Sequence, residues 1–576
     1  MEIASYSFDN VGLSAINKHR LGQNWPVVYL IHNKKDNKPE LYVGETTSAI
    51  KRVNQHLANP ERRKMTDLKV IFDNKFNKSA ILDIEQTLIQ MFLADQKYTL
   101  QNRNGGQSSK HDYYQRAIYQ NMVDDIWDSL YKCNFTNSDS SVIRNSNLFK
   151  YSPYNTLTPE QEKVSFEILN HIMDCLESGK KGTSVLQGRA GTGKSILIIH
   201  MIYSLVKAAE ITYNDNDLSP EEYIDLGYRV ALHSRIANYV ASHGHLNIGF
   251  VVPMTSIRLT FKKVFGASKD AGLQGKMVIG PQEALKQDYD ILFVDEAHRL
   301  ARRKSLTSYG SFDDACRGLG IDPHTSTQLD MIQSSCKYSV LVYDENQTVK
   351  SSDLTPDQFT GALSGRSVMK SELTTQMRCS GGAEYIDSLD NLFSCKEDNI
   401  TDFKDFDLQI FNDPNELISN IRSLDRTFGL CRTVAGYSWE WISKGCSKIT
   451  EAVKCGKEDI ELCGKKYVWN MSNQEWILRQ DAVNEIGCIH TTQGYDLNYV
   501  GVILGREIDY NPLTNSITVN RDLFYDAKVK ANVDDNMLKT YIINSYKVMM
   551  SRGIKGCYIY ACNPNLQKYL RKYFQR

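Results

Sequence analysis

The segment that most restricts the fold of this chain is residues 188–195, which read Gly-Arg-Ala-Gly-Thr-Gly-Lys-Ser. It lies between a short apolar strand at 184–187 and an apolar helix that begins at Ile196. In this context glycines let backbone N–H groups close around a phosphate, and the helix N-terminus adds a partial positive charge. The lysine is placed to reach the β- and γ-phosphates of a nucleotide, and the serine to ligate Mg²⁺. The predicted nucleotide-binding residues are Gly188, Gly191, Gly193, Lys194 and Ser195.

Two further apolar runs end in polar residues, as strands do beside a nucleotide. Residues 289–294 read as a buried strand that runs directly into Asp295 and Glu296. A carboxylate at a strand tip can hold magnesium through water, and the next one can activate the attacking water as a general base. We therefore assign the first carboxylate to the metal and the second to catalysis. Residues 340–343 form another predicted strand, and Gln347 beyond its tip is a candidate sensor of the γ-phosphate.

Later segments follow in an order that resembles the superfamily 1 helicases. Residues 157–161 resemble the glutamine motif that reads adenine, and 375–378 the motif with a phosphate-contacting arginine. Residues 489–496 resemble the motif that couples the nucleotide to the bound strand, and 546–553 the final motif, whose arginine acts as a finger. The residues to which the resemblance gives these roles are Gln161, Arg378, Gly494 and Arg552. If a second domain carries both arginines to the γ-phosphate, hydrolysis is tied to domain closure.

Three shorter segments narrow this resemblance. Residues 297–300, 434–441 and 552–556 look most like the bacterial helicases with a Schlafen-type helicase domain. The likeness covers nearly all of the chain from Leu157 onward. It implies two RecA-like domains with ATP between them and a nucleic-acid strand across their top.

Contacts to the nucleic acid are predicted on weaker grounds. Residues 255–263 join hydroxyl and basic side chains, which suits phosphate binding, and His490 and Thr491 offer the same in the second domain. Four tryptophans could stack on bases, although a place in the core is the commoner role for tryptophan. They are Trp439, Trp441, Trp469 and Trp476.

A different, smaller unit precedes the nucleotide-binding region. Residues 27–31 and 41–44 read as the strands of a β-hairpin around a polar turn at 33–39. Helical patterns follow at 49–57 and 79–93. The order of Tyr29, Tyr42, Arg52, His56, Glu85 and Asn102 resembles the GIY-YIG nuclease family, and the resemblance covers about residues 27–102.

That resemblance implies phosphodiester cleavage with one divalent metal. Glu85 would hold the cation at the scissile phosphate, and Arg52 would stabilise charge on the phosphorus. Tyr29 or Tyr42 as a phenolate, or else His56, would take the proton from the attacking water. The first strand lacks the family's glycine and isoleucine, and the second has valine for isoleucine, but the polar set is intact. The alternatives are a folded but inactive relic of the family, and a small unrelated domain whose tyrosines match by chance.

Composition sets the outer limits of these interpretations. The 576 residues suggest about three to five folding units, and 41% hydrophobic with 24% charged residues is ordinary for a soluble globular protein. The formal net charge of 0 argues against one large basic face but permits local basic stripes. The 13 cysteines lack zinc-ligand spacing and favour reduced thiols. No secretory signal or membrane-spanning run is evident, so we expect a cytoplasmic location and no membrane partner.

Together these patterns predict an α/β chain: a small α+β GIY-YIG nuclease domain followed by two RecA-like P-loop domains with parallel sheets. The expected parts are a nuclease domain at 1–110, a connector at 111–153 that includes a mobile loop, a first RecA-like ATPase domain at 154–372, and a second RecA-like domain at 373–576 with a tryptophan-containing insertion.

The expected function is that of an ATP-dependent helicase or translocase fused to an endonuclease that cleaves DNA, in defence against foreign DNA. Its cofactors would be ATP and Mg²⁺, or Mn²⁺ at the nuclease site, and its partner single-stranded or branched DNA. The alternatives are a DNA-repair nuclease-helicase, an RNA-processing helicase, and an ATP-gated nucleic-acid sensor or clamp with an inactive nuclease. The oligomeric state is left open.

Overall fold

A computed structural model describes most of the chain. The residues outside this description are 34–38, 63, 103–112, 190, 211–219, 305, 307–308, 345–346, 349–351, 377–378, 397–402, 404, 447, 472–475, 477–478, 480, 493–494, 532 and 575–576, together with the side chains of 220–225 and 528. The chain divides into two compact units. Unit 1 comprises Met1–Thr156 and Ala267–Gly272, and unit 2 comprises Leu157–Gly266 and Leu273–Arg576.

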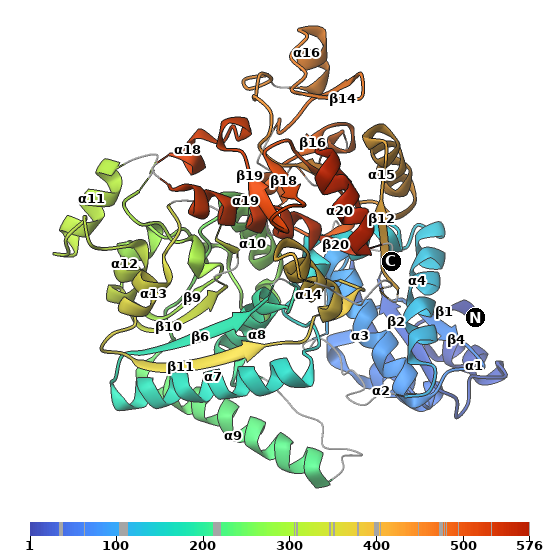
Figure 1. The fold of residues 1–576 in the computed structure, drawn as a ribbon. Coiled ribbons are helices and arrows are strands. Elements are labelled where there is room, and N and C mark those ends of the chain that lie inside the picture. Colours follow the sequence, from blue (N-terminus) through green and yellow to red (C-terminus); the bar gives the residue numbers. More distant parts are fainter. Residues whose placement is uncertain are drawn as a thin grey trace. The chain divides into compact units, whose positions relative to one another are not determined.

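Unit 1 is built around a five-stranded sheet with the strand order β1-β4-β2-β3-β5 (Figure 1). Neighbouring strands are antiparallel, except that β3 and β5 are parallel. Its first elements are β1 (Glu2–Ser7), α1 (Asn10–Lys18), β2 (Val27–His32), β3 (Glu40–Thr46), α2 (Ala49–Ala58), β4 (Asp67–Phe72), α3 (Lys78–Asp95) and β5 (Thr99–Leu100). The predicted hairpin strands and both predicted helices are confirmed, whereas β1, α1 and β4 were not anticipated.

The segment that the sequence assigns to a connector packs into the core of unit 1. It contains α4 (Arg116–Lys132), α5 (Ser140–Asn145) and α6 (Asn147–Lys150). The buried ring of Trp127 on α4 lies 4.7 Å from that of Phe92 on α3, centroid to centroid. The loop expected to be mobile is fixed by hydrogen bonds, because the Asp95 carboxylate accepts the backbone N–H groups of Asn137 at 2.9 Å and Ser138 at 3.2 Å. Local polarity predicted the loop but not the buried carboxylate that holds it.

Unit 2 contains two parallel sheets, as predicted. The first has the order β11-β6-β10-β9-β7-β8, and its strand pairs are parallel. Its strands are β6 (Gly182–Gly188), β7 (Ile248–Val251), β8 (Val278–Ile279), β9 (Tyr289–Val294), β10 (Cys336–Tyr343) and β11 (Ser367–Leu373). The helices of this part are α7 (Pro159–Ser178), α8 (Lys194–Lys207), α9 (Pro220–His243), α10 (Thr255–Ala267), α11 (Tyr309–Gly318), α12 (Gln328–Ser334) and α13 (Pro356–Gly361). Because the strands are parallel, the loops after β6, β9 and β10 meet at one edge, where ligands of such sheets bind.

The second sheet of unit 2 has the order β12-β20-β17-β13-β16, again with parallel pairs. Its strands are β12 (Asp407–Ile410), β13 (Cys431–Ala435), β16 (Ile486–Gly487), β17 (Leu497–Leu504) and β20 (Gly553–Ala561). The helices are α14 (Gly382–Phe393), α15 (Pro414–Phe428), α16 (Ile449–Lys454), α17 (Ile489–Thr492), α18 (Ala527–Lys530), α19 (Asp535–Met550) and α20 (Pro564–Phe574). Two hairpins are separate from this sheet: β14 (Ile460–Leu462) with β15 (Lys465–Tyr467), and β18 (Ile508–Asn511) with β19 (Ser516–Val519). Figure 1 shows α16 and β14 projecting beyond the second sheet. None of the described helices is long and apolar enough to cross a membrane.

Candidate functional site

The glycine-rich loop leads from β6 into α8 with a backbone that requires glycine. Gly191 and Gly193 have φ angles of +90° and +78°, in the left-handed region that glycine enters without steric cost. A Cβ atom on Gly191 would also lie 2.0 Å from Oε1 of Gln376, so the loop has no room for a side chain there. The first turn of α8 follows directly, and its N–H groups face the loop as an anion site requires.

The lysine and serine of this loop point to two different partners. The Lys194 ammonium donates to the carbonyl oxygens of Gly188 at 2.5 Å and Arg189 at 2.7 Å. The Ser195 hydroxyl donates to Oδ2 of Asp295 at 2.7 Å. This bond joins the loop after β6 to the tip of β9. It therefore brings together the hydroxyl and the carboxylate that the sequence assigned to Mg²⁺, and such oxygen donors suit that ion.

The two acids after β9 lie in different electrostatic surroundings. Burial and the neighbouring Glu296 raise the pKa of Asp295. Burial also opposes ionisation of Glu296, but the ion pair with His298 at 3.0 Å and the charge of Arg299 lower its pKa. His298 is fully buried, so its imidazole is fixed beside this carboxylate. We infer that Glu296 stays ionised, and that Asp295 takes up a proton more readily than an exposed aspartate does.

The two candidate glutamines are buried and hydrogen-bonded within the protein. Gln161 caps its own helix, where its side chain accepts from the Thr158 N–H, and it donates to the Thr192 carbonyl at 3.0 Å. It therefore fixes the phosphate loop at Thr192. Its predicted contact with adenine stays a prediction. Gln347 donates to Asp344 at 2.7 Å, close to the tip of β10.

An ionic contact that the sequence did not predict links the phosphate loop to the second sheet. Arg189, inside the loop, pairs with Asp387 on α14 and lies 4.0 Å from Asp390. Lys547 on α19 pairs with the same Asp390. Arg189 occupies a variable position of the loop motif, so no local signal marked it. The predicted Arg378 and Gly494 lie outside the described residues, and Arg552 is buried at the end of α19.

Most of the proposed nucleic-acid contacts are structural in the described part of unit 2. Trp439, Trp469 and Trp476 are buried, which rules out base stacking by those three, and Trp441 alone of the four is partly exposed. Their burial follows from packing of the inserted segment, which a sequence pattern cannot separate from a stacking surface. Thr491 is buried and donates to the Cys488 carbonyl at 2.8 Å, so its hydroxyl is directed inward.

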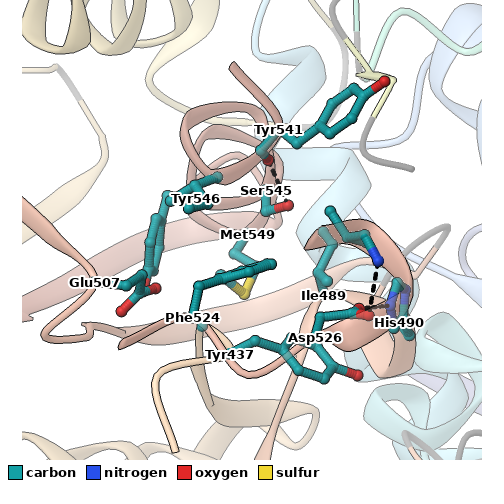
Figure 2. A pocket seen from close by; sticks show the side chains of 13 residues that line it. Tyr437, Ile489, His490, Glu507, Phe524, Asp526, Tyr541, Ser545, Tyr546 and Met549 are labelled. Atoms are coloured by element: carbon teal, nitrogen blue, oxygen red, sulfur yellow. Dashed lines mark hydrogen bonds and ion pairs between the residues drawn. The ribbon is translucent and has the colours of Figure 1, made fainter. Parts of the chain in front are cut away.

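His490 lines a small cavity in the second part of unit 2 (Figure 2). Its imidazole lies 3.5 Å from the Asp526 carboxylate, and Tyr437 and Phe524 line the same space. On another wall the Tyr546 hydroxyl donates to the buried carboxylate of Glu507. The volume of about 20 Å³ admits roughly one water molecule, so this cavity is no ligand site.

Four of the predicted nuclease residues converge in unit 1. The Tyr29 hydroxyl lies 2.7 Å from Nε2 of His56, and the Tyr42 ring lies 5.1 Å from the imidazole, centroid to centroid. The Tyr29 and Tyr42 rings are 6.2 Å apart. Burial raises the pKa of Tyr29 well above its usual value, and nearby Arg52 partly offsets that effect. The predicted cluster of Tyr29, Tyr42, Arg52 and His56 is thus present as a spatial arrangement.

Arg62 belongs to this cluster, although no sequence pattern placed it there. Its guanidinium lies 3.4 Å above the Tyr42 ring centroid and donates to Nδ1 of His56 at 2.6 Å. Burial and the charges of Arg62 and Arg52 lower the pKa of His56 to about 3. With Nδ1 accepting, the neutral imidazole carries its proton on Nε2 and donates to Tyr29. His56 is therefore a poor general base here and acts as a positioning residue.

Glu85 is a buried carboxyl group with a second carboxylate nearby, and both features oppose its ionisation. Burial and the nearby Glu45 carboxylate raise its pKa to about 8. Lys78 binds Glu45 at 2.6 Å and only partly offsets that repulsion. Among the described residues no group of three or more metal-ligating side chains occurs. Mg²⁺ nonetheless fits, because it commonly uses one or two protein carboxylates and completes its coordination with water and substrate phosphate.

Asn102 supports the sheet and does not face the cluster. Its side-chain amide donates to the Val43 carbonyl at 2.8 Å and accepts the Val43 N–H at 3.0 Å. The side chain thereby extends the pairing of β3 in the manner of a neighbouring strand. Asn102 therefore has a structural role in unit 1, and its assignment to the nuclease family's residue set stays a prediction.

The fold and site of unit 2 define a P-loop nucleotide-binding protein with two parallel α/β sheets. Residues 181–563 match the family described as Schlafen group 3, DNA/RNA helicase domain, and the chain belongs to that family. This membership indicates a nucleic-acid helicase domain that acts as an ATPase. Unit 1 up to Thr156 lies outside the match.

Two further similarities concern individual proteins. The chain is 26% identical over 451 residues to the uncharacterised protein YPL245W of Saccharomyces cerevisiae, across 72% of this chain and 90% of that protein. A crystal structure of the Pif1 helicase from Candida albicans aligns with 73% of this chain and 99% of its own, at 11% identity and a TM-score of 0.25. That likeness is too slight to bear on fold or function.

Proposed function

We propose that the chain is an ATP-driven motor that moves along nucleic acid and carries a metal-dependent nuclease in unit 1. The first half of this proposal, ATP-driven movement along nucleic acid, goes one step beyond membership of the helicase family. The observation that carries it is the hydrogen bond from Ser195 to Asp295. It holds two oxygen donors suited to Mg²⁺ beside the loop that bears Lys194.

Each residue of the motor site has a separate task in this proposal. Bound Mg²⁺ would neutralise charge on the β- and γ-phosphates. Lys194 exchanges its two loop carbonyls for phosphate oxygens, which are better acceptors because they are charged. Glu296, held ionised by His298, orients the attacking water and takes its proton. Arg378 and Arg552 remain the proposed arginines of the second part. Gln347 remains the proposed sensor of the γ-phosphate, and Gly494 part of the motif that couples the nucleotide to the bound strand.

The link from nucleotide to movement follows from the ionic contact between the two sheets. Arg189 in the phosphate loop pairs with Asp387, and both side chains are about half exposed. Such a pair is weak enough to break and reform in each cycle. A change at the phosphates therefore reaches α14 directly, and through Asp390 it reaches Lys547 on α19.

The nuclease part of the proposal rests on the Tyr29–His56–Arg62 arrangement and on the two carboxylates near it. A divalent cation held by Glu85, with Glu45 beside it, would supply a bound water of lowered pKa and offset charge on the phosphate. Arg52 would bind the scissile phosphate. Tyr29 stays protonated, since burial raises its pKa, and His56 keeps it in place. Tyr42 remains as the tyrosine that, as a phenolate, would take a proton from the attacking water.

Fusion of a motor with a nuclease suits the destruction of long foreign DNA, and we propose that biological role. Repair of the cell's own branched DNA is the competing role. The family description names both DNA and RNA, so RNA is tested beside DNA.

The decisive experiment measures cleavage and ATP hydrolysis together. Labelled single-stranded, duplex and forked DNA, and matched RNA, are incubated with Mg²⁺ or Mn²⁺, with and without ATP. Glu85→Gln should abolish cleavage and retain ATP hydrolysis, whereas Lys194→Ala should do the reverse. Asp125→Asn on α4 and Lys207→Ala at the far end of α8 are the matched controls, and both should behave as wild type.

Each outcome has a defined meaning. Cleavage by Glu85→Gln at the wild-type rate would show that the nuclease assignment is wrong. ATP binding without any nucleic-acid-stimulated turnover would favour a clamp or sensor over a motor. Preferential unwinding of RNA would transfer the proposal to an RNA-processing helicase.

A further inference from the structure

A basic groove runs along the outer face of α15 in unit 2. One wall is α15 (Pro414–Phe428), and the other is the β15 strand (Lys465–Tyr467) of the projecting hairpin. The groove has a volume of about 570 Å³. The Tyr467 hydroxyl donates to the Asn415 side chain at 2.6 Å and so fixes the hairpin against the start of the helix.

The charges in this groove are of one sign. Among the described residues that line it there are four cationic side chains and no acidic one: Arg422, Arg426, Lys465 and Lys466. Arg422 is anchored by the backbone carbonyls of Val483 at 3.3 Å and Asn484 at 3.2 Å.

Within the described ranges of the chain, the other three cations have no carboxylate partner. No ion pair involving Arg426, Lys465 or Lys466 occurs among the residues that the structure describes, and all three are exposed. Glu461 stands opposite Lys466 in the hairpin register and makes no ion pair with it. Because the whole chain has a net charge of 0, this local surplus is a feature of the groove and not of general basicity.

Hydroxyl groups accompany the cations at regular spacing. Ser419 and Ser423 are exposed one helical turn apart, and each precedes an arginine of the groove by three residues. On a helix, positions three and four apart share one face, so these four side chains form a continuous strip. Hydroxyl and cationic side chains are the groups that contact nucleic-acid phosphates without reading sequence.

The arrangement suits a polyanion better than a single anion. From Ser419 to Arg426 the strip is about 10 Å long, whereas phosphates along one strand of a duplex are about 3.4 Å apart along the axis. The cations also stand on two separate walls and do not converge on one point. A chain of phosphates can contact several of them together, which an isolated phosphate ion cannot do.

We propose that this groove is a second nucleic-acid binding site of unit 2, which holds a phosphate backbone independently of base sequence. The inference rests on the proposed function, in that the motor acts on nucleic acid. It adds a site on α15 and the projecting hairpin that is separate from the nucleotide-binding residues. Its role is to retain the nucleic acid beside the second sheet while the contact between the two sheets opens and closes.

The test compares salt dependence of binding in a triple variant and a matched control. Arg426→Ala, Lys465→Ala and Lys466→Ala are combined in the full chain. The control combines Lys163→Ala, Lys370→Ala and Lys568→Ala, three exposed lysines of unit 2 outside the groove. Fluorescence anisotropy measures binding of labelled single-stranded DNA, duplex DNA and RNA between about 50 and 200 mM salt.

The groove variant should bind more weakly to every sequence and show a smaller salt slope. Each lost phosphate contact reduces the slope of log K against log salt by about 0.7–0.9, so three contacts reduce it by about 2–3. The control should keep the wild-type slope, although it loses the same charge. ATP hydrolysis without nucleic acid should be unchanged in both variants. Replacing Arg426 by Lys should preserve the slope, because the charge is retained.

Failure of this inference differs from failure of the proposed function. If wild type binds nucleic acid and the groove variant has the same slope, the groove proposal is wrong while the motor proposal stands. If binding depends on the groove but ATP drives no strand separation or movement, the motor proposal is wrong and the groove remains. A labelled acidic peptide is tested in the same assay. If the groove variant binds this peptide less tightly than wild type does while its binding of nucleic acid is unchanged, the groove binds a protein partner and the proposal is wrong.

Discussion

Gly44→Ala is expected to break the tyrosine cluster of unit 1 by steric contact alone. A Cβ atom at residue 44 would lie 2.4 Å from both Cζ and the hydroxyl oxygen of Tyr29. The Tyr29 side chain is buried and hydrogen-bonded to His56, so it has no free space into which to move. Gly44 has no positive φ, and its backbone is therefore compatible with alanine. The ring contact is what requires glycine at this position.

The cost can be worked from these contacts. Overpacking a buried site costs about 1–3 kcal/mol. Loss of the Tyr29–His56 hydrogen bond adds about 0.5–1.5 kcal/mol. Gly44→Ala should therefore destabilise unit 1 by about 2–4 kcal/mol and abolish cleavage. In a Tyr29→Leu background the ring atoms are absent, and the same change should cost less than about 1 kcal/mol, because alanine is intrinsically the better strand residue.

A double-mutant cycle measures this coupling. Native-state hydrogen exchange of β2 and β4 amides reports the stability of unit 1 without interference from unit 2. The coupling energy between residues 44 and 29 should reach at least about 1 kcal/mol. An equal cost of Gly44→Ala in the Tyr29 and Tyr29→Leu backgrounds would refute the steric explanation. Gly44 would then serve some other purpose.

Three further changes have defined expectations. Ser195→Ala removes the hydroxyl that donates to Asp295. The Mg²⁺ concentration that gives half-maximal ATP turnover in steady-state assays should rise at least about tenfold, and Ser195→Thr should restore the wild-type value. Asp387→Asn breaks a half-exposed pair with Arg189; urea unfolding should change by less than about 1 kcal/mol, while ATP turnover loses part of its salt sensitivity. Arg62→Ala removes a positive charge from the imidazole of His56, so its pKa, followed by NMR, should rise from about 3, and cleavage should fall.

The sequence predicted those parts of the sites that are local. The loop after β6, the acids after β9 and the hairpin strands are each defined within a few residues, because a phosphate loop or a buried strand has its own short pattern. Arg62 was missed because it joins His56 and Tyr42 only through the fold. Nor could periodicity show that Trp469 and Trp476 lie in the core, since a tryptophan in a short segment of mixed polarity is compatible with either position.

Residues that were predicted for one role can also be used for another. Gln161 was identified from its motif, yet its described bonds cap a helix and hold the phosphate loop at Thr192. Asn102 was identified from its position after the second helix, yet it pairs with the backbone at Val43. In both cases the side-chain amide both donates and accepts a hydrogen bond, and these partners become visible only in the fold.

The two sites place a pair of carboxylates together, but they balance the charge differently. In unit 2, His298 and Arg299 lower the pKa of Glu296, so that pair keeps a negative charge at neutral pH. In unit 1, Glu85 has a pKa of about 8, and Lys78 is paired with Glu45. Below about pH 8 a proton therefore competes with a metal ion for Glu85. At neutral pH the Glu296 carboxylate of the motor site is already ionised.

This difference predicts that pH separates the two activities at limiting Mg²⁺. The ionised fraction of Glu85 rises roughly tenfold from pH 6 to 7 and roughly fivefold from pH 7 to 8, and cleavage should rise with it while ATP turnover changes much less. Protonation also favours the folded state of unit 1, because the pKa of Glu85 is raised on folding; that contribution is complete below about pH 4.5 and is lost as pH rises through about 8. Saturating Mg²⁺ should move the rise in cleavage to lower pH. Parallel pH profiles for cleavage and ATP turnover at all Mg²⁺ concentrations would mean that Glu85 does not hold the metal, since its proton would then have nothing to displace.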